Sequence, residues 1–88
     1  MRRRLLAQLA EYRPGYPVTA ADLILVRDHR RSALVRRASA ILHAEWRAGR
    51  IGAVEEHGPR GGRGFYRYGG DYPRPAWVEP GARRGLER

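Results

Sequence analysis

The sequence predicts one small α+β domain in which three helices are followed by a β-hairpin and an extended tail. Apolar residues repeat at helical spacing near the start and in the middle of the chain, and a helix-capping motif lies between these segments. After Gly49 the apolar pattern changes to the short runs typical of strands. The chain has 88 residues, so we expect a modest core and no deep enclosed active site.

The first helix is predicted over residues 3–13. Residues 13–17 (Arg-Pro-Gly-Tyr-Pro) end this helix, because proline and glycine favour a rigid turn. The buried side of the helix is expected to carry four residues at helical spacing, which are Leu5, Leu6, Leu9 and Tyr12.

The second helix is predicted over residues 20–27. Thr19 is a suitable N-cap, and Asp22 lies three residues later as its capping-box partner. Val18 and Leu23 occupy the two positions of a hydrophobic staple. The helix would then bury Leu23 together with Ile24 and Val26.

The third helix is predicted to be the longest. Asp28 and Ser32 could each cap it, and the sequence does not decide between them. It runs to Ala48, with Gly49 as the residue after its C-terminus. Steps of about 100° per residue gather one apolar arc of Leu34, Val35, Ala38, Ile41, Leu42 and Trp46. The opposite arc is basic and mostly small, with His29, Ser32, Ala33, Arg36, Ala40, His43 and Arg47.

Two strands are predicted after this helix, over residues 51–56 and 64–68. Residues 57–63 between them form a basic, glycine-rich hairpin tip. Alternation along the second strand places Tyr66 or Tyr68 in the core. Residues 69–88 are rich in Pro, Gly and Arg and are expected to be an extended or disordered tail.

This order of elements resembles the winged helix-turn-helix family. The resemblance rests on residues 17–23 at the start of the second helix, residues 32–51 as the recognition helix and its exit, and residues 58–68 as the wing. It covers about residues 3–68, so we divide the chain into a winged-helix domain (1–68) and a tail (69–88). The stretch from Leu23 to Gly49 is longer than usual for the family, by about one helical turn.

The resemblance implies sequence-specific binding of double-stranded DNA, with the third helix in the major groove and the wing beside it. Small exposed residues near the start of that helix suit the groove, and Arg36 is the candidate for guanine. The expected base contacts are Ser32, Ala33, Arg36 and Ala40. The expected phosphate contacts are Thr19, Arg30, Arg31, Arg37 and His43. On the wing, Arg60 and Arg63 would reach the minor groove or the backbone.

The charge of the chain agrees with an anionic partner. Its 18 Lys+Arg residues are all arginine and exceed the 9 acids, which gives a net charge of +9. Residues 27–50 hold seven arginines against Asp28 and Glu45. GC-rich coding accounts for much of the choice of Arg over Lys, although Arg also suits phosphate and guanine better. Coding does not explain the excess of cations.

Composition excludes several other classes. Without cysteine there is no disulfide, thiol nucleophile or zinc ribbon, and the scattered histidines do not suggest a metal site. No nucleophile–base pair stands at an interpretable spacing, so we expect neither an enzyme nor a cofactor or small-molecule ligand. No apolar run approaches the ~20 residues of a membrane span, and the start of the chain lacks a signal-peptide pattern. A cytoplasmic protein, nucleoid-associated when bound to DNA, is therefore expected.

The sequence leads to one main hypothesis and one alternative. The main hypothesis is a small prokaryotic or phage transcriptional regulator, with a homodimer possible through the first helix and residues 72–78. The alternative is a winged-helix module that binds RNA or an acidic protein partner, since a fold does not determine its partner.

Overall fold

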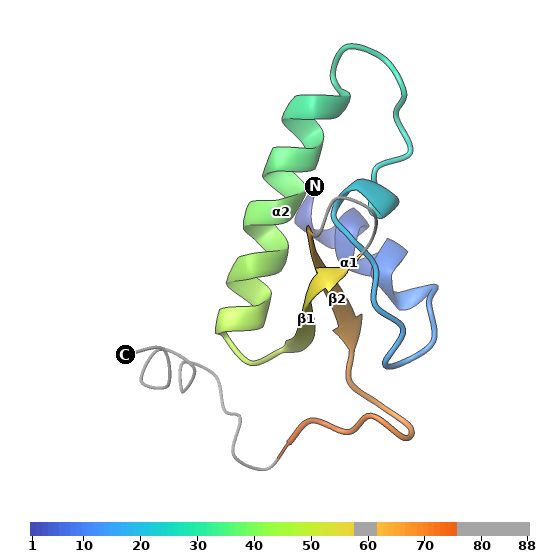
Figure 1. Cartoon of the computed structure of the whole chain (residues 1–88). Helices are drawn as coiled ribbons and strands as arrows, with labels where there is room; N and C mark the ends of the chain where they lie inside the picture. The colour runs from blue at the N-terminus through green and yellow to red at the C-terminus, as the bar shows by residue number, and fades with distance from the viewer. Residues whose placement is uncertain (58–61, 76–88) are drawn as a thin grey trace.

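The computed structural model describes residues 1–57 and 62–75. These residues form two α-helices, α1 (Arg2–Ala10) and α2 (Arg31–Arg47), with a single 3-10 turn, η1 (Ala21–Leu23), between them. Two strands follow, β1 (Ile51–His57) and β2 (Gly62–Arg67), and pair as an antiparallel hairpin. Figure 1 shows α2 along one side of the molecule and the hairpin between it and α1. The predicted α+β class is confirmed, but only two of the three expected helices are present among these residues. No described helix is long and apolar enough to cross a membrane.

The predicted capping motif is present, although the helix expected to follow it is not. The backbone N–H of Thr19 donates to Asp22 Oδ2 at 2.9 Å, and the N–H of Asp22 donates to Thr19 Oγ1 at 3.2 Å. The chain turns once and then becomes extended at Ile24, which has φ −99° and ψ 111°. The prediction of a helix over 20–27 is therefore wrong. β-Branched Ile24 and Val26 disfavour a helix here, and Arg31 binds the carbonyls of both residues.

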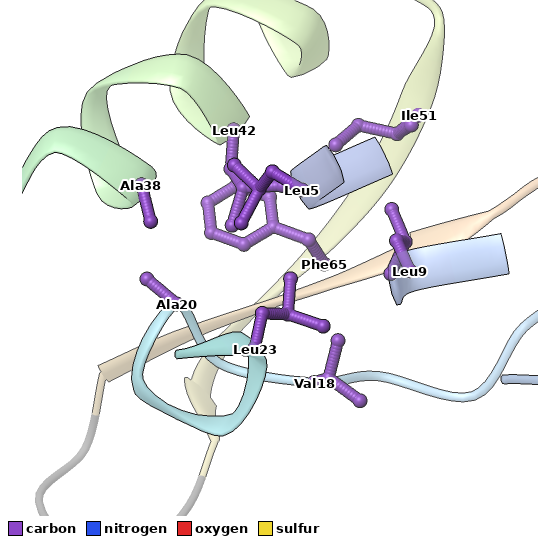
Figure 2. Close-up of a cluster of buried hydrophobic side chains, with 9 residues drawn as sticks. All are labelled: Leu5, Leu9, Val18, Ala20, Leu23, Ala38, Leu42, Ile51 and Phe65. Atoms are coloured by element: carbon purple, nitrogen blue, oxygen red, sulfur yellow. The ribbon is translucent and has the colours of Figure 1, made fainter. Parts of the chain in front are cut away.

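The core lies where α1, η1, α2 and the hairpin meet (Figure 2). Phe65 is the largest fully buried side chain, at 1% exposure. The expectation that Tyr66 or Tyr68 points into the core is wrong, because a shift of one residue reverses the face of a strand. Tyr66 instead pairs with Gly52 on the other face of the hairpin, where a Cβ on that glycine would collide with the tyrosine ring. The buried apolar residues are Leu5, Leu9, Val18, Ala20, Leu23, Ala38, Leu42, Ile51 and Phe65.

One residue before the capping motif also pairs with the hairpin. Val18 N–H donates to the carbonyl of Phe65 at 2.9 Å, and Phe65 N–H donates to the carbonyl of Val18 at 2.7 Å. This bridge attaches the 3-10 turn to β2. Consequently η1 lies beside α2 although the segment between them is not helical.

The predicted C-terminus of α2 is confirmed, but its predicted N-cap is not. Its N-cap residue is Arg30, which makes no side-chain capping bond, so neither Asp28 nor Ser32 caps the helix. Gly49 follows the C-terminus with φ 78°, a left-handed conformation that glycine adopts without strain.

Glu45 is a buried carboxylate in the apolar arc of α2, and its residue is only 2% exposed. Arg2 donates to Oε1 through Nε at 2.9 Å and through Nη2 at 2.5 Å, while Arg50 Nε donates to Oε2. Burial raises the pKa of Glu45, but the hydrogen bonds from Arg50 and Arg2 outweigh this, and the pKa lies below its ordinary value. The pair of arginines joins the start of α1 and the start of β1 to α2.

The residues just after β2 fold back onto the domain. Gly69 and Tyr72 exchange backbone hydrogen bonds of 2.7 and 2.8 Å, which closes a turn. The Tyr72 ring covers Gly15 so closely that a Cβ there would lie 2.2 Å from it. The tail expected from residue 69 thus begins with a packed turn, and residues 76–88 lie outside the described residues.

Candidate nucleic-acid interface

A groove runs along α2 and has a volume of about 740 Å³. One wall comes from the capping motif and η1, another from α2 and the third from the start of β2. It is lined by Thr19, Ala20, Ala21, Asp22, Arg31, Ser32, Val35, Arg36, Ser39, His43, Gly62, Arg63 and Phe65. The structure therefore brings together six residues that the sequence placed in the site from three separate segments: Thr19, Arg31, Ser32, Arg36, His43 and Arg63.

The remaining predicted residues fall outside this groove. Ala33, Arg37 and Ala40 are exposed on α2 beside it. Arg30 is exposed at the N-cap of the helix. Arg60 lies outside the described residues. The exposed face of α2 thus continues from the rim of the groove across a surface of small side chains and arginines.

Arg47 also belongs to this exposed face, although it is not among the contact residues expected from the sequence. It follows Arg36 by three helical turns and is exposed like it. Arg47 was present in the basic arc of the sequence, and that arc was the signal that could have identified it.

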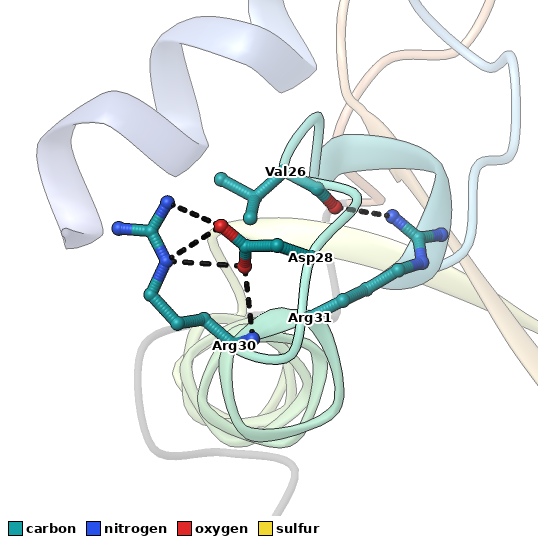
Figure 3. A network of polar contacts seen from close by, with 4 residues as sticks. All are labelled: Val26, Asp28, Arg30 and Arg31. Carbon is teal, nitrogen blue, oxygen red and sulfur yellow. Dashed lines mark hydrogen bonds and ion pairs between the residues drawn. The ribbon is translucent and has the colours of Figure 1, made fainter.

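Arg31 is partly buried, and its guanidinium binds carbonyls of the protein itself. Its Nη1 donates to the carbonyl of Ile24 at 2.6 Å. The same atom donates to the carbonyl of Val26 at 3.2 Å (Figure 3). Its Nη2 donates to the carbonyl of Ala21 at 3.1 Å. One guanidinium thus satisfies three carbonyls of the segment before α2 and fixes the shape of the groove wall.

Arg30 is paired with the acid two residues before it. Its Nε lies 3.1 Å from both oxygens of Asp28, and its Nη2 donates to Oδ2 at 2.8 Å (Figure 3). The backbone N–H of Arg30 also donates to Oδ1 at 2.9 Å. Hydrogen bonds from Arg30 lower the pKa of Asp28, so the pair stays ionised and its charges offset each other.

Arg63 packs against α2 and β1. Its Nη2 donates to Glu55 Oε1 at 3.0 Å, and its guanidinium carbon lies 4.2 Å from the centre of the Trp46 ring. Its side chain is 25% exposed. The stack holds the base of the hairpin loop against the last turns of the helix.

His43 lines the groove together with Phe65. Its Nδ1 lies 2.8 Å from the carbonyl oxygen of Ser39, which can only accept, so Nδ1 carries a proton. Its ring meets Phe65 edge to face at 5.1 Å between centroids. The other ring nitrogen, Nε2, is then the one with which His43 could contact a ligand.

Four arginines around α2 make no ion pair within residues 1–57 and 62–75: Arg27, Arg36, Arg37 and Arg47. All four are exposed. Among the same residues, no group of three or more His, Asp or Glu side chains could hold a metal ion. This surface therefore presents unneutralised guanidinium groups, which suit phosphate and the guanine edge.

Comparisons with protein-family models, curated proteins and solved structures return no match to this chain. The function proposed next therefore rests on the geometry of the groove and the exposed face of α2.

Proposed function

We propose that this protein binds double-stranded DNA with sequence preference, as a small transcriptional regulator, through the exposed face of α2. One observation carries the proposal: a groove and an adjoining helix face combine predicted contact residues from three segments with four arginines that have no acidic partner in the described part of the chain. Polyanion binding requires cations that the protein itself does not neutralise.

The shape of α2 supports duplex DNA in particular. A helix enters the major groove, which is about 12 Å wide, only if its leading face lacks bulk. Ser32, Ala33 and Ala40 provide such a face, and Arg36 projects from its middle. Arg36 is our candidate for the O6 and N7 atoms of guanine.

The arrangement of the other elements is compatible with a winged-helix-like fold. A capped turn in place of the usual second helix leads through an extended segment into α2, and the hairpin lies beside that helix (Figure 1). In this reading, the hairpin loop is the wing. Its base is anchored through Arg63, which stacks on Trp46.

The contacts within the protein revise the expected phosphate contacts. Arg30 is offset by Asp28, and Arg31 holds carbonyls, so neither is our first choice for phosphate. Arg27, Arg37 and Arg47 take that role, together with Thr19 and Nε2 of His43 at the groove. Three arginines on phosphates give an expected slope of log K against log[salt] of about −3.

The decisive experiment is selection of bound sites from a random duplex library, followed by a salt titration of the best site by fluorescence anisotropy. An enriched sequence bound with a slope of about −3 supports the proposal. Failure to enrich any sequence, or a slope near zero, contradicts it.

The same unpaired arginines would also suit RNA or an acidic protein surface. Competition at fixed salt between the selected duplex, a structured RNA and a single strand distinguishes these partners. Preferential displacement by RNA would assign the surface to RNA instead of duplex DNA.

A further inference from the structure

A second surface of the protein gathers all five tyrosines of the chain. Tyr12 and Tyr16 stack with their ring centroids 5.6 Å apart and nearly parallel, at 5°. Tyr66 lies 5.8 Å from Tyr68 and 6.4 Å from Tyr72 by the same measure. We call these five residues the tyrosine strip.

The strip is continuous because Tyr72 covers Gly15. The glycine lies between the stacked pair in sequence, has φ 83° and has no space for a side chain beneath the Tyr72 ring. Gly15 N–H also donates to the carbonyl of Arg67 at 2.9 Å, which joins the turn after α1 to the end of β2. Two segments far apart in the sequence thus make one aromatic surface.

None of the five rings is buried in the core. Tyr16 is 45% exposed and Tyr72 is 55% exposed, and the other three are partly exposed. Of the five tyrosines, only Tyr12 is among the partly buried residues that pack against the edge of the hydrophobic core. Large exposed apolar patches are uncommon on soluble monomers and are typical of interaction sites.

The charges beside the strip differ from those on α2. Glu11 and Asp71 are next to Tyr12 and Tyr72 in the sequence, and three arginines also lie within two residues of a tyrosine of the strip: Arg13, Arg67 and Arg74. Arg13 lies over the Tyr16 ring at 5.6 Å, and Arg67 donates to the carbonyl of Tyr12 at 2.8 Å. A surface with nearly balanced charge is a poor polyanion site, whereas tyrosine and arginine are enriched where protein chains meet.

We propose that the tyrosine strip is the contact between two copies of this chain. A two-fold contact places the same patch against itself, so a charged patch is self-complementary only if it carries both signs. The tyrosine strip has residues of both charge signs beside it, whereas the exposed face of α2 is basic. Figure 1 shows the turn after α1 and the segment after β2 together, at the end of the molecule away from the N-terminus of α2. A dimer formed there leaves that end of α2 accessible.

The test is sedimentation velocity of the full chain over a range of concentrations, without DNA. We expect a reversible monomer–dimer equilibrium in the wild type and a dissociation constant raised about tenfold or more in Tyr72→Ala. Tyr16→Ala is the second variant, because it removes an exposed ring without uncovering Gly15. Far-ultraviolet circular dichroism verifies that each variant is folded.

Leu25→Ala is the matched control. Leu25 is an exposed apolar residue outside the strip, at 72% exposure, and its loss should leave association unchanged. A wild type that stays monomeric, association unaffected by both tyrosine variants, or loss of the dimer in Leu25→Ala overturns the proposal. Binding of a thymidine single strand by a monomeric wild type, lost in Tyr72→Ala, would assign the strip to unpaired bases instead. None of these outcomes depends on the duplex-binding surface of α2, so the two proposals fail separately.

Discussion

Arginine occurs in two settings on opposite sides of α2. At Glu45, Arg2 and Arg50 converge on one carboxylate that is almost inaccessible to water. Across the helix, Arg36 and its neighbours extend into solvent without an acidic partner among the described residues. The same side chain thus stabilises the fold at one site and is available to a ligand at the other. Whether an arginine can bind a ligand therefore depends on whether an acid lies beside it, and the total charge of the chain does not show this.

Replacing Glu45 should have the largest effect. Glu45→Ala removes the group that joins the starts of α1 and β1 to α2 and leaves a cavity. We expect the free energy of unfolding to fall by about 2–3 kcal/mol, below the usual cost of breaking a buried pair because both arginines are half-exposed. Urea denaturation measures this loss. DNA affinity measured well below the melting temperature should stay at the wild-type value, and a specific loss of affinity would contradict the separation of the two settings.

The carboxylate of Glu45 should also make the free energy of unfolding depend on pH in the acid range. The pKa of Glu45 is lower in the folded protein than its ordinary value of 4.5, so its contribution is complete above about pH 4.5. The contribution is lost as the pH falls through the folded pKa. Urea denaturation at several pH values should therefore show that the free energy of unfolding falls more steeply with decreasing pH in the wild type than in Glu45→Gln. Parallel pH profiles would show that Glu45 is not the group responsible.

Arg36→Ala should weaken DNA binding without affecting the fold. Loss of a bidentate guanine contact costs about 1–3 kcal/mol and relaxes preference at one base pair. The selected duplex and its single-base variants, titrated by anisotropy, measure both effects. Equal weakening on selected and random duplexes would make Arg36 a phosphate contact instead. Unfolding by urea should be unchanged, because the side chain is exposed.

Arg37→Ala and Arg30→Ala form a matched pair with the smallest expected effects. Both residues are exposed, but only Arg30 has an acidic partner in the described structure. Arg37→Ala should make the salt slope less negative by about 1, whereas Arg30→Ala should change it less. If the slope of log K against log[salt] changes equally in the two variants, an ion pair does not keep an arginine from contacting phosphate. The distinction between paired and free arginines would then be wrong.

Local sequence signals predicted much of this structure. The capping box of Thr19 and Asp22, the glycine after α2 and the order of helix and strands are all present. Each depends on residues close together in the chain. The groove residues of α2 follow from helical periodicity for the same reason.

The missed features depend on contacts and orientations that no local sequence pattern specifies. Residues 24–27 are not helical, partly because Arg31, several residues later, binds the carbonyls of Ile24 and Val26. Glu45 lies in the apolar arc of α2, where helical periodicity predicts an apolar residue. Its partners Arg2 and Arg50 lie outside this helix. The face of β2 was assigned to Tyr66 or Tyr68 instead of Phe65, because alternation does not specify which of two adjacent residues points inward.

The bridge between Val18 and Phe65 has a consequence for how the chain folds. Its two residues are separated by most of the described sequence, with α2 and β1 between them. Contacts of such long sequence separation form late and slow the folding of small domains. During synthesis, the helices can emerge and coil long before β2 is available to close the core. Folding should therefore be completed only after Phe65 has left the ribosome, and shorter nascent chains would keep their apolar side chains exposed to chaperones.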